Sequence, residues 1–205
     1  MFELLTFAFI NLMGTMSPGP DFAMVTRYGL TGSRKAALLA TCGISTALLI
    51  HISYCLLGIA YLLQESPHLF FLLQLCGSLY LGYLGIRLIL PCKTEQQPEK
   101  IQKHRPFFTG FMTNLLNPKA TLFILSLFSQ FVTPEMPFSL KLIYASLIPL
   151  TALGWFSLLS VLLTHRHFLS TLQRYQRHFI RTMGALLLLL SLSILLSALK
   201  TYLSK

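Results

Sequence analysis

Six long apolar runs dominate this chain and constrain its fold more than any other feature. They cover residues 4–20, continuing past Asp21 to 26, then 36–63, 69–86, 107–132 with Lys119 inside, 142–164 and 182–199. A helix needs about 20 mainly apolar residues to cross the hydrocarbon core of a bilayer. Because each run has roughly this length, the sequence predicts an all-α membrane protein with six transmembrane helices.

Composition and length agree with this prediction. Only 11% of the residues are charged and 54% are hydrophobic, whereas an ordinary soluble domain carries about 25% charged residues. Six membrane spans use about 120 residues of the 205, and the remainder is too short for a further soluble catalytic domain. We therefore expect residues 1–205 to form a single transmembrane domain.

The net charge of +10 is placed unevenly along the chain. Twelve of the sixteen Lys and Arg residues lie in the connections that follow the first, third and fifth runs, and only Lys141, Lys200 and Lys205 lie on the opposite side. Basic residues accumulate on the cytoplasmic side of membrane proteins. The pattern predicts that both termini are outside, and it explains the basic composition without a nucleic-acid partner.

The longest polar connection divides the chain into two halves. Residues 91–106 are polar, basic and flanked by prolines, which is the composition of a flexible linker. We expect this segment to be a cytoplasmic linker between a first half, residues 1–90, and a second half, residues 107–205. Each half then contains three helices.

Two of the runs contain a charged residue, and in both runs it directly follows a helix-breaking element. Asp21 follows Ser17-Pro18-Gly19-Pro20, and Lys119 follows Asn117-Pro118. Proline removes a backbone donor, and unwound backbone in a bilayer is tolerated only when it is buried in protein or lines a water-filled cavity. The first and fourth helices are therefore predicted to be broken, with a polar site at the breaks.

The positions of the breaks predict an internal repeat. Each break lies in the first helix of a three-helix half, and because three is odd the two halves cross the membrane in opposite senses. This is the arrangement of inverted-repeat transporters, in which broken helices meet near the midplane. The predicted substrate and ion path consists of Ser17, Pro18, Gly19, Pro20, Asp21, Asn114, Asn117, Pro118 and Lys119.

These motifs resemble those of the lysine exporter (LysE/RhtB) family of bacterial amino-acid efflux proteins. The resemblance rests on Gly14 to Asp21, on Arg27 to Gly32 with the following basic residues, and on Gly110-Phe111 leading through Asn114 to Lys119. It implies an exporter of amino acids or close derivatives in the bacterial inner membrane, driven by an ion gradient. The aspartate after Pro-Gly-Pro is more similar to the threonine/homoserine exporter branch than to the lysine/arginine branch.

The resemblance suggests a mechanism for a zwitterionic substrate. Lys119 and a half-helix N-terminus are suited to a carboxylate, while Asp21 and unwound carbonyl groups are suited to an ammonium group. We expect Asp21 to carry the coupling proton of an antiporter. In straight helices Asp21 and Lys119 would be separated by about 12 Å along the membrane normal, so we treat them as two walls of one polar path rather than as an ion pair.

Two other functions are compatible with the sequence. An intramembrane lipid-modifying enzyme could use Asp21 and His51, and a passive channel for small solutes would need no coupling. His51 could relay protons, although an interhelical hydrogen bond, for example with Tyr54, is the favoured interpretation. No metal-ligand spacing or cofactor motif is apparent in the sequence, so no metal or cofactor is expected. The expected partners are an amino acid, a proton and the lipid bilayer, and a homodimer is left open.

Overall fold

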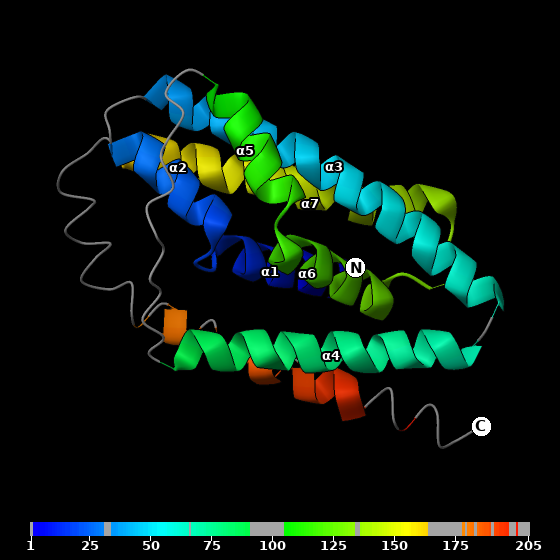
Figure 1. Ribbon diagram of the computed structural model, residues 1–205. Coiled ribbons are helices and arrows are strands. Elements are labelled where there is room, and N and C mark those ends of the chain that lie inside the picture. The colour runs from blue at the N-terminus through cyan, green and yellow to red at the C-terminus, as the bar shows by residue number, and fades with distance from the viewer. Residues whose placement is uncertain are drawn as a thin grey trace.

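The protein is a bundle of α-helices, and Figure 1 presents it as a computed structural model. The structure describes residues 2–30, 34–65, 67–90, 105–133 and 136–163, together with helical stretches at 178, 180–182, 184–189, 191–196 and 200. All regular elements within these residues are helices. The expected linker lies outside the described residues except for Arg105 and Pro106.

The first and fourth apolar runs each form two helices, and the second, third and fifth form one. The helices are α1 (Phe2–Met16), α2 (Pro20–Leu30), α3 (Arg34–Glu65), α4 (Pro67–Ile89), α5 (Pro106–Leu115), α6 (Pro118–Phe131) and α7 (Phe138–Leu162). A further apolar helix runs between Ile180 and Leu196. The breaks between α1 and α2 and between α5 and α6 therefore lie at the prolines that predicted them.

The outer surface of the bundle is apolar. Leu57, Leu116 and Phe138 are 73%, 76% and 71% exposed, which would be unfavourable in water and is suited to lipid. Within the described residues, three helical segments are long and apolar enough to cross a membrane, namely Arg34–Gly58, Phe71–Ile89 and Phe138–Leu162. The expected all-α membrane fold is thus confirmed.

Helix α3 contacts α2, α4, α5, α6 and α7. Helices α3 and α5 cross closely because each helix places a glycine against the backbone of the other. A Cβ on Gly43 would lie 2.0 Å from the carbonyl oxygen of Phe107, and a Cβ on Gly110 would lie 2.2 Å from that of Ala40. Small residues of this kind allow membrane helices to approach each other at backbone distance.

An aromatic cluster joins α1, α6 and α7. The ring of Phe7 is fully buried, stacks on Phe128 at 6.2 Å and meets Phe131 and Tyr144 edge to face at 5.5 and 4.8 Å. Stacked and edge-to-face pairs at these distances add to the stability that burial supplies. The cluster fixes α1 and α6 side by side, so the ends of both helices meet inside the bundle (Figure 1).

Helix α4 lies along one side of the bundle and is attached to α6 by polar side chains (Figure 1). Gln74 donates to the Ser129 carbonyl at 2.9 Å, and Gln130 donates to the Gln74 carbonyl at 2.9 Å. On its other side, α4 touches the helix after α7, where Ser191 donates to the Ser78 carbonyl at 2.6 Å. Helices α1 and α6, which end and begin at the two breaks, lie between α4 and the layer formed by α3 and α7 (Figure 1).

Candidate functional site

The first helix break is formed by Ser17, Pro18 and Gly19 between α1 and α2. Pro18 and Pro20 supply no backbone donor, so the hydrogen-bond ladder of a continuous helix cannot pass through them. Pro20 is instead the first residue of α2, a position where the missing donor costs nothing. The Ser17 hydroxyl donates to the Gly14 carbonyl at 2.5 Å and thereby satisfies one of the free carbonyls at the end of α1.

The second break lies between α5 and α6 and is built around Asn117. The Asn117 backbone N–H donates to the Asn114 carbonyl at 2.9 Å, which closes the end of α5. Its side-chain oxygen accepts from the Lys119 backbone N–H at 3.0 Å, and Pro118 follows it as the first residue of α6. Asn117 is therefore the N-cap of α6, a role for which asparagine is among the favoured residues.

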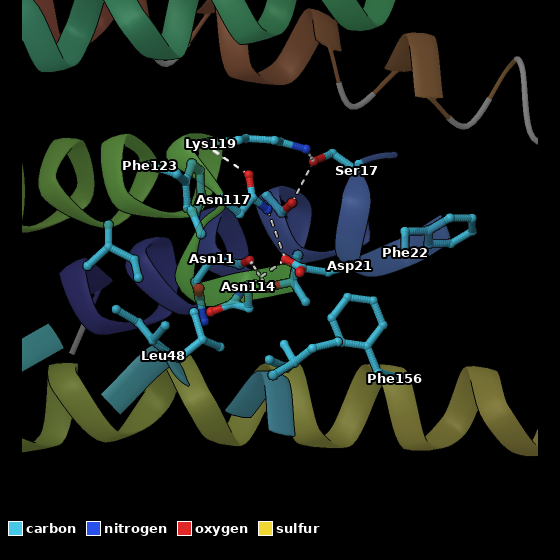
Figure 2. Close-up of a pocket in the computed structure, with 18 residues that line it drawn as sticks. Asn11, Ser17, Asp21, Phe22, Leu48, Asn114, Asn117, Lys119, Phe123 and Phe156 are labelled. Carbon is cyan, nitrogen blue, oxygen red and sulfur yellow. Dashed lines mark hydrogen bonds between the residues drawn. The ribbon is translucent and has the colours of Figure 1, made fainter. Parts of the chain in front are cut away.

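Each break is held by side chains from the other break (Figure 2). Lys119 Nζ donates to Ser17 Oγ at 2.5 Å and to the Pro18 carbonyl at 3.0 Å. In the opposite direction, Asn114 Nδ2 and Asn117 Nδ2 both donate to Asp21 Oδ2, at 3.0 and 3.2 Å. The four half-helices therefore meet in one hydrogen-bonded cluster.

Asp21 and Lys119 lie at the same cluster without pairing directly. Among the hydrogen bonds of these two described residues, Lys119 Nζ goes to Ser17 and Pro18, and the Asp21 carboxylate receives only the two asparagine amides. Asn117 lies between the charges, with its amide nitrogen on Asp21 and its oxygen on the Lys119 backbone. The two residues therefore do not form a direct ion pair, as expected, but they share one polar wall instead of forming two separate walls.

The cluster borders a cavity of about 60 Å³. One wall is polar and includes Asn11, Ser17, Asp21, Asn114, Asn117 and Lys119 (Figure 2). The remaining wall is mainly apolar, with Phe22, Ile44, Leu48, Phe123, Ile148 and Phe156. A cavity with charged groups of both signs on one side and aromatic and aliphatic side chains on the other is suited to a small zwitterion.

Comparison with known proteins assigns the chain to a family. Residues 12–198 match the LysE type translocator family. The chain belongs to this family. Because it is a translocator family, the protein is a transporter and not an enzyme, and the lipid-modifying enzyme considered from the sequence is set aside.

Several relatives of this LysE type translocator have names that state a substrate. The threonine efflux protein of Salmonella typhimurium is 30% identical over 169 residues, covering 79% of this chain and 82% of the relative. The threonine efflux protein of Escherichia coli K12 is 30% identical over 165 residues, covering 77% and 80%. The leucine efflux protein of Salmonella choleraesuis is 32% identical over 126 residues, covering 58% of each chain. The substrates in these names agree with the expected threonine/homoserine exporter-like branch of the family. No solved structure matches the chain.

His51 connects α3 of this translocator to the second break. The side chain is fully buried, and Nε2 lies 3.1 Å from the Asn114 carbonyl oxygen. Nδ1 is hydrogen-bonded to the Tyr54 hydroxyl and lies 3.1 Å from Thr121 Oγ1, while the Tyr54 hydroxyl donates to Thr121 at 3.0 Å. His51 is thus an interhelical hydrogen-bonding residue, but its bond to Tyr54, the expected partner, lies within α3. The bonds to Asn114 and Thr121 were not predicted.

The structure brings the predicted path residues of this translocator together. Six of them line the cavity, namely Ser17, Gly19, Asp21, Asn114, Asn117 and Lys119. Pro18 contributes its carbonyl to Lys119, and Pro20 and Pro118 begin the half-helices. Asn11 and the aromatic wall were missed. Phe22 directly follows Asp21 and Phe123 lies one turn after Lys119, so proximity to the breaks could have identified both.

Proposed function

We propose that this protein exports small amino acids from the bacterial cytoplasm across the inner membrane in exchange for protons. The observation that carries the proposal is the cavity at the two interlocked breaks, which places Asp21 and Lys119 on one wall. An amino acid carries one positive and one negative group at neutral pH, and a dry site needs a partner for each. Asp21 supplies the negative charge of this site and Lys119 the positive one.

The apolar wall favours an uncharged side chain. Phe22, Phe123 and Phe156 line the cavity and offer the substrate an apolar surface. The names of the relatives, threonine and leucine efflux proteins, support the same substrate class. We therefore propose a neutral amino acid such as threonine.

The helix contacts support an inverted-repeat mechanism. If α1 corresponds to α5, α2 to α6 and α3 to α7, several contacts of the first half have a counterpart in the second. Helix α3 packs on α5 as α7 packs on α1, and α3 touches α6 as α7 touches α2. In this proposal residues 1–90 and 107–205 are the two repeats of a single transporter domain, joined by the linker 91–106. The repeats rock around the broken helices to expose the cavity alternately to each side.

The charge distribution supports an orientation with both termini outside. Helix α2 leads from the cavity to Arg27 in its last turn, Arg34 and Lys35 follow at the start of α3, and α5 begins after the basic linker. Because basic connections are retained on the cytoplasmic side, the N-terminus of α1 is then on the outer side. A fusion of alkaline phosphatase to the C-terminus, active only outside the cytoplasm, tests this orientation.

Gradient-driven export tests the function itself. Cells that produce the protein and are loaded with dipeptides should accumulate threonine or a related amino acid in the medium, and a protonophore should abolish the difference from control cells. Asp21→Asn keeps the size of the side chain but removes the proton-binding carboxylate, so we expect it to reduce proton-coupled export at least tenfold. Export by this variant at the wild-type rate would contradict the role of Asp21. Export by the wild type that is unaffected by the protonophore would favour a passive channel.

A further inference from the structure

Two side-chain oxygens in the cavity wall are buried and have no hydrogen-bond partner. They are Asp21 Oδ1 and Asn114 Oδ1. Asn114 is only 1% exposed, and both Asp21 and Asn114 line the cavity. Three other buried polar atoms of the described chain also lack a partner, in Thr26, Ser45 and Trp155, but none of these residues lines the cavity.

The hydrogen bond between Asn114 and Asp21 determines which amide atom of Asn114 is free. An ionised carboxylate only accepts hydrogen bonds, so the Asn114 amide must turn its nitrogen toward Asp21 Oδ2. Its oxygen is therefore the unpaired atom. Asn117 differs in this respect, because its oxygen is already used by the Lys119 backbone. Only one of the two asparagines on Asp21 thus offers a free acceptor.

A donor for these two oxygens has to come from outside the described chain. Lys119, the other ionisable side chain on the cavity, directs its ammonium to Ser17 and Pro18. Buried acceptors are rarely left unpaired, and a charged one least of all. A water molecule could donate to both oxygens but carries no charge. A primary ammonium group supplies three donors and the positive charge that the carboxylate requires.

We propose that Asp21 Oδ1 and Asn114 Oδ1 form the subsite for the ammonium group of the exported amino acid, and that the coupling proton competes for the same Asp21 oxygen. This inference rests on the proposed function and specifies its chemistry. When the ammonium group leaves, a proton binds to Oδ1 and converts the carboxylate to a carboxylic acid. Oδ2 keeps both asparagine amides throughout. The site therefore holds either the substrate or one proton, which is the condition for a one-to-one exchange.

No other titratable group around Asp21 takes part in this competition between the substrate and the proton. From α6 the facing group is Lys119, and from α3 it is His51, which lies behind Asn114 and contacts its backbone carbonyl. No ionisable side chain lines the cavity from α1, from Ser17 at the first break or from α7. The lining residues there are Asn11, Gly14, Thr15, Ser17, Ile148, Ala152 and Phe156. Substrate and proton then compete directly, so a lower pH on the side of substrate entry raises KM and leaves kcat nearly unchanged.

Substrate analogues test the subsite without any mutation. Purified protein in liposomes is assayed for exchange of labelled L-threonine, with unlabelled L-threonine, L-threoninamide and N-acetyl-L-threonine as competitors. Threoninamide retains the ammonium group and should compete, whereas N-acetyl-L-threonine has lost it and should be at least tenfold weaker. Equal competition by the two analogues would overturn the proposal. If the wild type exchanges neither threonine nor leucine nor homoserine, the proposed function itself fails, and the subsite with it.

A pair of asparagine variants and a pH series complete the test. Asn114→Ala removes the free oxygen, so we expect KM for threonine to rise about tenfold and the difference between the two analogues to shrink. Asn117→Ala is the matched control, because it removes the other amide on Asp21 without removing a free acceptor, and it should keep the difference between the analogues. The subsite would be refuted if Asn114→Ala still discriminated between the two analogues as the wild type does. It would also be refuted if a lower pH reduced kcat while KM stayed constant. Either result would leave proton-coupled export intact.

Discussion

Lys119 shows how a charged residue can be placed deep in an apolar helix. Its ammonium group donates to Ser17 Oγ and to the Pro18 carbonyl, and so satisfies backbone that the first break leaves free. The group has three donors, and these bonds use two of them. Gly19 makes room for it, because a Cβ there would lie 3.3 Å from Nζ. Lys119 therefore both stabilises the first break and lines the cavity.

We predict that Lys119→Ala reduces export at least tenfold, because no other described residue of the cavity carries a positive charge. Ser17→Ala removes one acceptor of Lys119 and keeps its charge, so its effect should be only a few-fold. Efflux of threonine from loaded cells, normalised to the amount of protein in the membrane, measures both. Wild-type efflux by Lys119→Ala would exclude this residue from the substrate path.

At the level of elements, the break between α5 and α6 is supported by α3. The Asn114 carbonyl accepts from the Asn117 backbone N–H within the break and lies 3.1 Å from His51 Nε2 of α3. Thr121, in the second turn of α6, contacts the other ring nitrogen of His51. One histidine thus connects the last turn of α5 with the first turns of α6. The position of the Asn114 side chain on Asp21 depends on this support.

We predict that His51→Phe lowers both stability and export, since it removes the hydrogen bonds of the ring to the Asn114 carbonyl and to Thr121, which then keep only the Asn117 backbone N–H and the Tyr54 hydroxyl as partners. A typical intramolecular hydrogen bond contributes about 0.5–1.5 kcal/mol to stability. His51→Gln can donate to Asn114 and accept from Thr121, so it should restore most of the activity. The thermal midpoint of the purified protein in detergent and the KM for threonine measure the two effects. Failure of glutamine to restore export would instead favour a proton-relay role for His51.

At the level of the whole molecule, the site depends on how closely the helices pack. Gly43 and Gly110 bring α3 and α5 to backbone contact, and Phe7 holds α1 against α6 and α7. Each of these two contacts joins the first half of the chain to the second. A shift of either would move Asn114 away from Asp21. The hydrogen bonds of the site are therefore a consequence of global packing.

We predict that Gly43→Ala prevents most of the protein from folding, because the new Cβ would lie 2.0 Å from a backbone oxygen that cannot turn aside. Gly154→Ala is the matched control, since no atom lies within 4 Å of a Cβ at that position in α7. It should be neutral or slightly stabilising, as alanine favours a helix over glycine by about 1 kcal/mol. Size-exclusion chromatography of the detergent-solubilised variants measures the folded fraction. A monodisperse Gly43→Ala protein would contradict the close crossing.

Much of this molecule follows from features that act locally along the chain. The apolar runs determine where helices form, because an unpaired backbone in lipid is too costly. Pro18, Pro20 and Pro118 determine where those helices break, because a residue without an N–H cannot continue the ladder. The presence of a polar site at the breaks follows from the same reasoning, and so does the choice of Asp21 and Lys119 as its charges.

Only the tertiary structure decided which groups meet. Straight helices would separate Asp21 from Lys119 by about 12 Å, but the bends at the breaks bring both to one cavity, where Asn117 lies between them and each charge binds the other break. The roles of Phe22, Phe123 and His51 depend on contacts between helices that are far apart in the chain. A local pattern carries no information on the angle at which two helices cross, because that angle results from side-chain packing along their whole length.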